Sequence, residues 1–261
     1  MKRVLFIFAI LGLTTVVAFG QNRANIPVSA FTGINATGLF EITVQRGNTE
    51  SLMIEHYEDV RSQLYSEVRD GVLHLHLAGG QTLNATIVMR NLEYVTLSGV
   101  GNLVVNDLFT PDSFRFNGNG ANSIVINLNT NQLDIELSGA NNIELNANVS
   151  GYTRFNVSGA GNISGNLITE RAVFDYRGAG DTTLTGSAAH ATINALGAVN
   201  LHLIDFPIRE AIVNAPGASN IRVNATNSLE INASGVSLIR YTGTTNVQVR
   251  NRGGMSRVSR L

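Results

Sequence analysis

A glycine-centred phrase recurs along the chain at intervals of about 20 residues, and it constrains the fold more than any other feature. The phrase reads LSGVGN from Leu97, VSGAGN from Val157 and APGASN from Ala215. Its first glycines are separated by 19, 21, 20, 19, 19, 20 and 18 residues, and they are Gly99, Gly118, Gly139, Gly159, Gly178, Gly197, Gly217 and Gly235. A period of this length over eight copies is typical of a solenoid, in which each repeat packs on its neighbours.

The residues around each glycine alternate between apolar and polar. Every copy is apolar four residues before the glycine, from Val95 in the first copy to Ile231 in the last. Most copies are apolar again four and six residues after it, as at Ile143 and Leu145. A period of 2 predicts strands with one buried face. We therefore expect two strands around a glycine turn in each coil, followed by a third, weaker strand.

Strands that recur in this way are expected to stack in parallel, with about 4.8 Å between coils. We predict an all-β fold, a single-stranded parallel β-helix, in which stacking creates one continuous core. The glycine forms a corner that requires positive φ or a close backbone approach. The residue three positions later is expected to form a side-chain ladder along the stack, through Asn102, Asn142, Asn162, Asp181, Asn200 and Asn220. The copy at Gly118 departs from the spacing, and we interpret Asn119 and Gly120 as a two-residue bulge.

The two ends of the chain differ from the repeat. Residues 1–20 combine a basic start, an apolar run and a small-x-small site, which predicts a secretory signal peptide. We expect export through the inner membrane to the periplasm, the outer surface or the medium, and no transmembrane segment in the mature chain. Residues 21–82 lack the repeat, and we predict strands, a short helix over 58–65 and a hairpin around Asp70–Gly71. This segment is expected to cap the β-helix of residues 83–261.

The composition excludes several functions. The chain has no cysteine, and its only lysine is Lys2, which excludes thiolate and Schiff-base chemistry in the mature protein. Without Lys2 and Arg3, 16 basic residues stand against 19 acidic ones. This balance argues against nucleic-acid binding, which needs a basic face for phosphate. No sequence motif indicates a cofactor.

Three segments carry a resemblance to a known family. They are FTGINATGLFEITVQRG from Phe31, DGVLHLHL from Asp70 and YTGTTNVQVRNRGGMSRV from Tyr241, with the SGAGN-type coils between them. Over residues 28–258 the chain resembles the bacterial family named "putative auto-transporter adhesin, head GIN domain". The resemblance implies a secreted or envelope-facing, right-handed β-helix, and this handedness agrees with the rule for parallel crossovers. It supplies no catalytic residue.

Charged residues gather on the outward face of three successive coils, and they are Asp134, Glu136, Arg154, Asp175 and Arg177. We expect Asp134 and Arg154 to be stacked neighbours, and Glu136 and Asp175 to lie two coils apart, at about 10 Å. That distance is long for a shared metal or a carboxylate dyad. Three interpretations stay open for this charged face: cross-strand ion pairs, a contact for a glycan or a partner protein, and catalysis.

Other polar features are weaker. His74 and His76 share one face of a strand at a spacing that can ligate a metal, but no third ligand accompanies them, and we predict no metal site. Asp181 lies in a GAGD sequence similar to calcium-binding repeats, and we interpret it as a corner residue that replaces asparagine. From Ile231 onward there are five arginines and no acidic residue. This end is interpreted as a charged edge that prevents end-to-end pairing, or as a contact for a partner or an anionic glycan.

These observations favour an exported, non-catalytic β-helix protein with a structural or adhesive role at the cell envelope or surface. One alternative is a carbohydrate-active enzyme, either a polysaccharide lyase or a hydrolase, on the same scaffold. Another is a periplasmic scaffold that binds a second envelope protein. The regular coils carry no long insertion that would build a cleft, which favours the first hypothesis. The expected partner is therefore a glycan or an envelope protein, and the sequence sets no oligomeric state.

Overall fold

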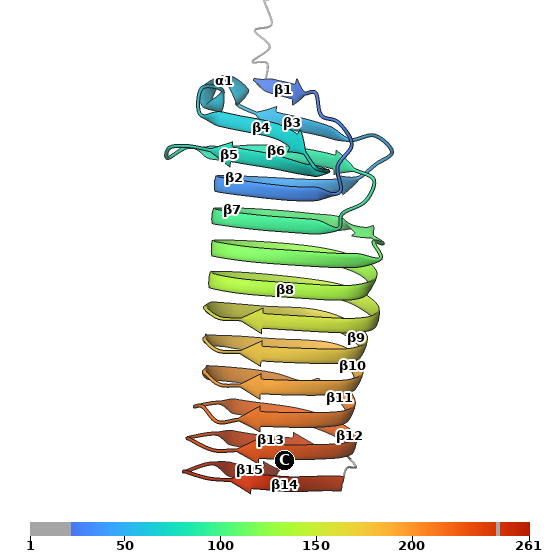
Figure 1. The fold of residues 1–261 in the computed structure, drawn as a ribbon, viewed down its shortest axis with the longest axis vertical. Coiled ribbons are helices and arrows are strands. Elements are labelled where there is room, and N and C mark those ends of the chain that lie inside the picture. The colour runs from blue at the N-terminus through green and yellow to red at the C-terminus, as the bar shows by residue number, and fades with distance from the viewer. Residues whose placement is uncertain (1–21, 244–245) are drawn as a thin grey trace, which may run out of the picture.

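The computed structural model describes residues 22–243 and 246–261, and these residues form a right-handed parallel β-helix of about eight turns (Figure 1). This confirms the fold predicted from the repeat. The predicted signal peptide, residues 1–20, lies outside the described residues. Within the described residues, no helix combines the length and the hydropathy needed to cross a membrane.

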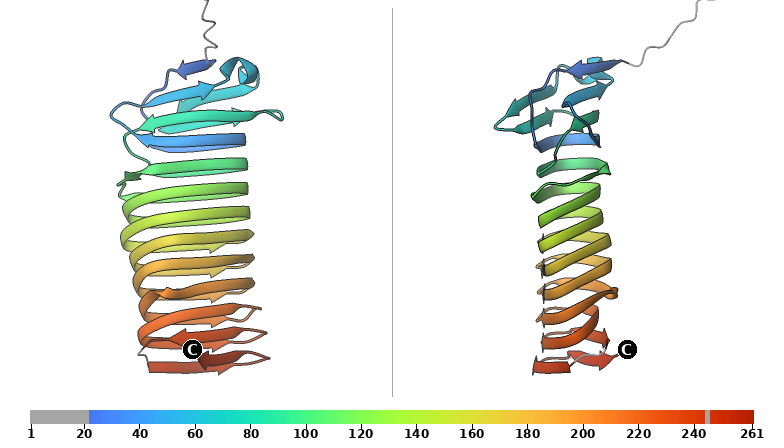
Figure 2. Two further views of the ribbon diagram at one scale, coloured as in Figure 1. Left: turned by 180° about the vertical axis from the view of Figure 1, so that it is seen from behind. Right: turned by 90° about the vertical axis from the view of Figure 1, so that its right-hand side faces the viewer.

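The β-helix is built from strands that each pair in parallel with a strand of the adjacent coil. Viewed from other sides, the coils form one unbroken stack with a flattened cross-section (Figure 2). The strands of the stack are β2 (Gly33–Arg46), β7 (Tyr94–Phe109), β8 (Ser113–Val157), β9 (Ala160–Tyr176), β10 (Ala179–Ala195), β11 (Ala198–Ala215), β12 (Asn220–Ala233), β13 (Leu238–Thr242), β14 (Asn246–Arg252) and β15 (Arg257–Arg260). Most of these strands run through the gentler corners of a coil, so the third strand expected from the sequence is continuous with the second.

The N-terminal segment closes one end of the stack. β6 (Thr82–Met89) pairs with β2 in parallel, and β3 (Ser51–Glu55) and β1 (Arg23–Ile26) then add in antiparallel orientation. β4 (Leu64–Arg69) and β5 (Val72–Leu77) form the predicted hairpin, with φ of 53° at Asp70 and 73° at Gly71. The predicted helix over 58–65 is wrong in extent, because α1 covers only Tyr57–Val60 and Leu64 already begins β4.

Apolar side chains from successive coils fill the interior. Phe155 lies opposite Phe174 in the strand pairing, both are fully buried, and their rings stack at 5.2 Å. Phe206 meets Phe174 edge-on at 6.5 Å. Burial of such large side chains in every layer supplies the main favourable free energy of folding, because the chain has no disulfide.

Glycines stack on glycines at the sharp corner of the coils. At Gly159 a Cβ atom would lie 2.2 Å from the carbonyl oxygen of Gly139 and 2.4 Å from its amide nitrogen. Gly99 has the same close contact with Gly38 and also has a φ of 130°. The corner therefore requires glycine because the backbones of adjacent coils touch there, and in some coils also because φ is positive.

The strand pairing corrects one predicted corner. Gly99 lies opposite Gly120, and Leu97 lies opposite Gly118. Gly118 is thus an inward-facing strand position and not a turn, and Gly120 is the corner glycine of this coil. The two-residue bulge interpreted at Asn119 and Gly120 does not exist, because the coil spacing is regular once Gly120 replaces Gly118.

A buried amide pair fills the space that the absent side chain of Gly118 leaves. Asn141 is 1% exposed, and its Nδ2 donates to the carbonyl oxygens of Ser138 at 2.7 Å and Gly118 at 3.3 Å. Asn122 is equally buried and donates to Oδ1 of Asn141 at 2.9 Å. Burial of these amides is tolerated because the pair satisfies most of its own hydrogen bonds.

Candidate functional site

The predicted charged face lies on β8 and β9 and on the corner that follows β9. Arg154 and Asp175 form an ion pair, with Nη2 and Oδ2 3.1 Å apart. Asp134 pairs with Arg115 of the preceding coil, with Oδ2 and Nε 3.6 Å apart. No ion pair joins Asp134 to the neighbouring Arg154 in the described part of the chain. Two ion pairs between adjacent coils, both partly exposed to solvent, therefore hold part of the charged face.

The sequence interpretation missed Arg115 as part of this face, and the cause is the corner at Gly118. Counted from Gly118, Arg115 lies three residues before the corner, which is the repeat position that Glu136 occupies before Gly139. Counted from Gly120, it lies five residues before the corner, which is the repeat position that Asp134 occupies before Gly139. The correct register places opposite charges on adjacent coils, where cross-strand pairs contact each other.

Glu136 lies beside a polar hollow of about 420 Å³. Tyr94, Asn117 and Asn156 also line this hollow. The amide of Asn117, oriented to satisfy its neighbours, donates to Oε2 of Glu136 at 3.1 Å. Thr96 donates to the phenol oxygen of Tyr94 at 2.5 Å. An aromatic ring, a carboxylate and several amides thus share one open surface that a polar ligand can reach.

Asp175 begins a ladder of side-chain amides that the sequence interpretation did not single out. Its Oδ1 accepts a hydrogen bond from Asn194 at 2.6 Å. Asn194 accepts from Asn214 at 2.8 Å, and Asn214 accepts from Asn232 at 3.0 Å. The sequence pattern that could have predicted this ladder is the recurrence of asparagine three residues before successive corner glycines. Both oxygens of Asp175 are therefore engaged, one by Arg154 and one by Asn194.

The predicted ladder after the corner is present in the middle of the stack. Asn162 donates to Asn142 at 2.8 Å, and Asn200 donates to Asp181 at 2.7 Å. Asp181 is joined to Asn162 through its backbone amide at 3.1 Å. Asn102 instead donates to both carboxylate oxygens of Glu41 at 2.9 Å. At the other end, Oδ1 of Asn220 is buried without a hydrogen-bond partner in the described residues.

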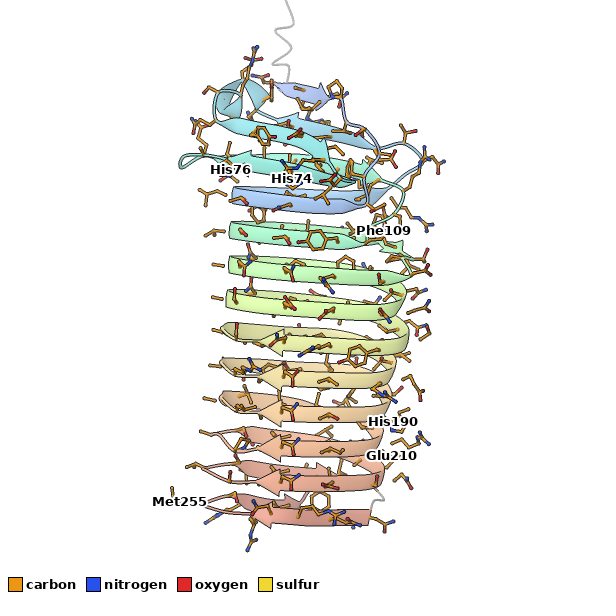
Figure 3. The ribbon with its side chains drawn as sticks, in the orientation of Figure 1. His74, His76, Phe109, His190, Glu210 and Met255 are labelled. Carbon is orange, nitrogen blue, oxygen red and sulfur yellow. The ribbon has the colours of Figure 1, made fainter. Side chains whose placement is uncertain are left out.

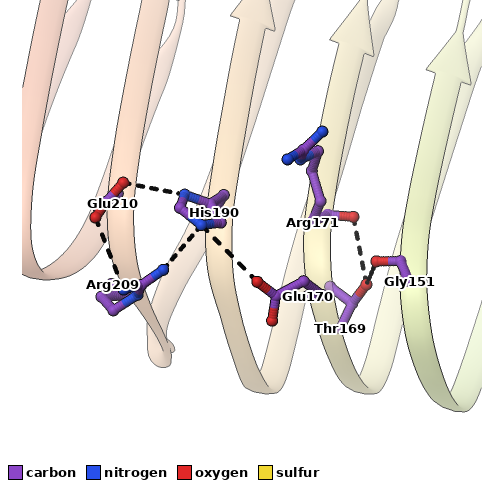
Figure 4. Close-up of polar contacts among 7 residues, drawn as sticks. All are labelled: Gly151, Thr169, Glu170, Arg171, His190, Arg209 and Glu210. Carbon is purple, nitrogen blue, oxygen red and sulfur yellow. Dashed lines mark hydrogen bonds and ion pairs between the residues drawn. The ribbon is translucent and has the colours of Figure 1, made fainter.

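A further charged cluster lies at the gentler edge of β9, β10 and β11 (Figures 3 and 4). Nδ1 of His190 lies 3.1 Å from Oε2 of Glu210, and its Nε2 lies 2.8 Å from Nη2 of Arg209. Glu170 approaches the same ring at 3.8 Å. His190 and Glu210 border an open hollow of about 420 Å³ that extends to Glu230. The sequence analysis did not single out these residues, and no sequence pattern indicates their contacts.

The other histidines form no comparable group. His74 and His76 lie on β5 near the capped end (Figure 3). The ring of His74 lies 3.5 Å from the amide of Asn35, and His76 is exposed. Across the described residues, no group of three or more histidine and acidic side chains is arranged to hold a metal ion.

The charged face presents charged groups and hydrogen-bonding groups to the solvent. Burial raises the pKa of the Tyr152 phenol, which Arg154 partly opposes. This phenol is protonated at neutral pH, as an ordinary tyrosine is, and it can donate a hydrogen bond near the Arg154–Asp175 pair. Exposed ion pairs of this kind contribute only about 0.2–1 kcal/mol each to stability. They are free to exchange partners with a charged ligand at little cost to the fold.

Comparison with known proteins identifies one family and several similar folds. A family model described as "Putative auto-transporter adhesin, head GIN domain" matches residues 30–181 and 148–245. No curated protein matches the sequence.

Solved structures share the fold at low sequence identity. A "putative adhesin" from Parabacteroides merdae ATCC 43184 is 18% identical, with a TM-score of 0.69 over 93% of this chain and 97% of that one. A "putative adhesin" from Parabacteroides distasonis ATCC 8503 is 22% identical, with a TM-score of 0.68 over 92% and 96%. A "putative lipid binding protein" from the same strain is 17% identical, with a TM-score of 0.64 over 93% and 98%. At these identities the likeness establishes the fold alone.

Proposed function

The chain belongs to the head GIN domain family of adhesin-like proteins, and on that premise we propose that it is an exported, non-catalytic β-helix that attaches to a glycan or an envelope partner. The attachment surface is the charged face of Asp134, Glu136, Arg154, Asp175 and Arg177. Its place of action is the cell envelope or the cell surface. The predicted signal peptide and the family description support this location.

The observation that carries the proposal is the open polar surface formed by the charged face and the hollow beside Glu136. It presents an aromatic ring at Tyr94, carboxylates and amide groups on a rigid stack of strands. Rigid strands hold these groups in fixed positions, so binding costs little conformational entropy. Such a surface suits the hydroxyl-rich chain of a glycan or the polar face of a protein.

The enzyme alternative has less support from the contacts. Asp175 is engaged at both oxygens, and the amide ladder of Asn194 to Asn232 holds it in place. A carboxylate in a structural ladder is poorly placed to act as a nucleophile or a proton carrier, which must reach the substrate directly. The other two carboxylates of the face are also engaged, Asp134 by Arg115 and Glu136 by Asn117.

Binding of the purified protein to a panel of immobilised glycans tests the proposal. The double variant Glu136→Ala/Asp175→Ala should fold normally and bind more weakly than the wild type, most clearly at low salt, where exposed charges are least screened. Glu58→Ala/Asp59→Ala in the capping helix removes the same charge far from the face and serves as the matched control. Equal binding by the two double variants would show that the charged face is not the contact.

A further inference from the structure

The last coils of the β-helix differ from the rest in their charges. From Ile231 onward there are five arginines and no acidic residue, and the arginines are Arg240, Arg250, Arg252, Arg257 and Arg260. Arg250 pairs with Glu230 of the preceding coil at 3.4 Å, and Arg260 donates to the carbonyl oxygen of Gly243 at 3.1 Å. Arg240, Arg252 and Arg257 form no ion pair within the described residues.

These three arginines border one hollow of about 610 Å³ at the C-terminal end of the stack. Ser259 and Met255 also line it, and Met255 is 73% exposed on the last coil (Figure 3). The hollow thus combines three guanidinium groups with two serine residues and several apolar side chains. Among the residues that the structure describes, no acidic side chain lines it.

The positive charge continues along the stack as a row. Arg222 lies opposite Arg240, on outward positions of β12 and β13. Nε of Arg222 is shielded from solvent and has no hydrogen-bond partner in the described residues. Like charges on adjacent strands about 4.8 Å apart destabilise a sheet. Elsewhere this protein places opposite charges in adjacent coils, as at Arg115 with Asp134 and Arg154 with Asp175.

We propose that the row of Arg222 and Arg240, together with Arg252 and Arg257 around the terminal hollow, binds a linear acidic polysaccharide. Guanidinium groups hold carboxylate and sulfate groups through paired hydrogen bonds, and bound anions would offset the repulsion between the stacked arginines. A row of cations along the stack axis matches a linear chain that carries repeated negative charges. A second copy of this protein that packed its own C-terminal end here would instead bring five further arginines against the same surface. This surface is separate from the charged face, so its failure would leave the proposed function standing.

Binding of the full protein to polygalacturonate, measured by calorimetry in low and physiological salt, tests this proposal. Arg240→Gln/Arg257→Gln should weaken binding by at least about tenfold, because two charge-assisted contacts are lost. Arg61→Gln/Arg69→Gln in the N-terminal cap makes the same change of charge, and it should leave binding within about twofold. Thermal unfolding of both double variants shows that the fold is kept.

Three further arms separate the alternatives. Methyl-esterified polygalacturonate, which lacks the charge, should not bind, and Glu58→Ala/Asp59→Ala in the capping helix should bind polygalacturonate like the wild type. Equal losses in the two arginine double variants would overturn the proposal, because they would show a general charge effect. Binding to phosphatidylglycerol vesicles without binding to polygalacturonate or to a sulfated polysaccharide would also overturn it, in favour of a membrane surface.

Discussion

At the residue scale, the corner glycines are the positions where this fold tolerates least change. A valine at Gly159 would place its Cβ within 2.4 Å of two backbone atoms of Gly139, and neither atom can move without breaking the stack. We expect Gly159→Val to lower the free energy of unfolding by about 3 kcal/mol or more. Urea unfolding measures the loss.

The matched control for this change is Gly80→Val. A Cβ at Gly80 meets no atom within 4 Å, so valine there should change stability by less than about 1 kcal/mol. Ser158→Val, next to the corner, should cost only its hydrogen bond to Leu137, about 1 kcal/mol. Equal losses at Gly159 and Gly80 would mean that the corner contact does not exist.

Asn162 tests the amide ladder in the same way. Its side chain donates to Asn142 and accepts from the backbone amide of Asp181. Asn162→Ala should lower the free energy of unfolding by about 1 kcal/mol. Asn106→Ala is the control, because the exposed side chain of Asn106 forms no hydrogen bond within the described residues. If the ladder stabilises the fold, Asn162→Ala lowers the free energy of unfolding more than Asn106→Ala does. Equal decreases in the two variants would contradict this.

At the element scale, the buried faces of β8 and β9 hold the coils together. Phe155 is fully buried and stacks on Phe174 of the next coil. Phe155→Ala should lower the free energy of unfolding by about 3–5 kcal/mol, because it leaves a cavity between two layers. Val100→Ala, at a position 52% exposed, should cost less than about 0.5 kcal/mol. A loss below about 1 kcal/mol at Phe155 would contradict the register.

The strands were predictable from the sequence because each coil repeats the same apolar alternation. The register of one coil was not predictable from the sequence. In its sequence FNGNGAN, Gly118 and Gly120 both fit the corner pattern. The choice depends on a contact between distant residues, because the buried amide of Asn141 occupies the space beside Gly118. Because the corner was assigned to Gly118, Arg115 was left out of the predicted charged face. The capping helix was overextended because Leu64 pairs with Leu77 in a hairpin instead of continuing the helix.

At the scale of the whole molecule, the two ends have different chemistry. Antiparallel strands cover the N-terminal end, whereas three arginines that form no ion pair within the described residues line the hollow at the C-terminal end. The repeat predicted the stack and the outward position of the charged residues. It could not predict which charges meet, because a pair such as Arg154 with Asp175 depends on a two-residue offset between coils as well as on the period. The contacts of His190 could not be predicted from the sequence either, because they join side chains of three coils.

The central claim is that this β-helix binds without catalysing a reaction. The most direct test is to incubate the purified wild type with a broad panel of neutral and acidic polysaccharides. The assay then measures new reducing ends and the ultraviolet absorbance of unsaturated products. We predict no turnover of any polysaccharide, including those that the protein binds. Clear turnover by the wild type that is abolished in Glu136→Ala/Asp175→Ala would contradict the claim and would identify the charged face as an active site.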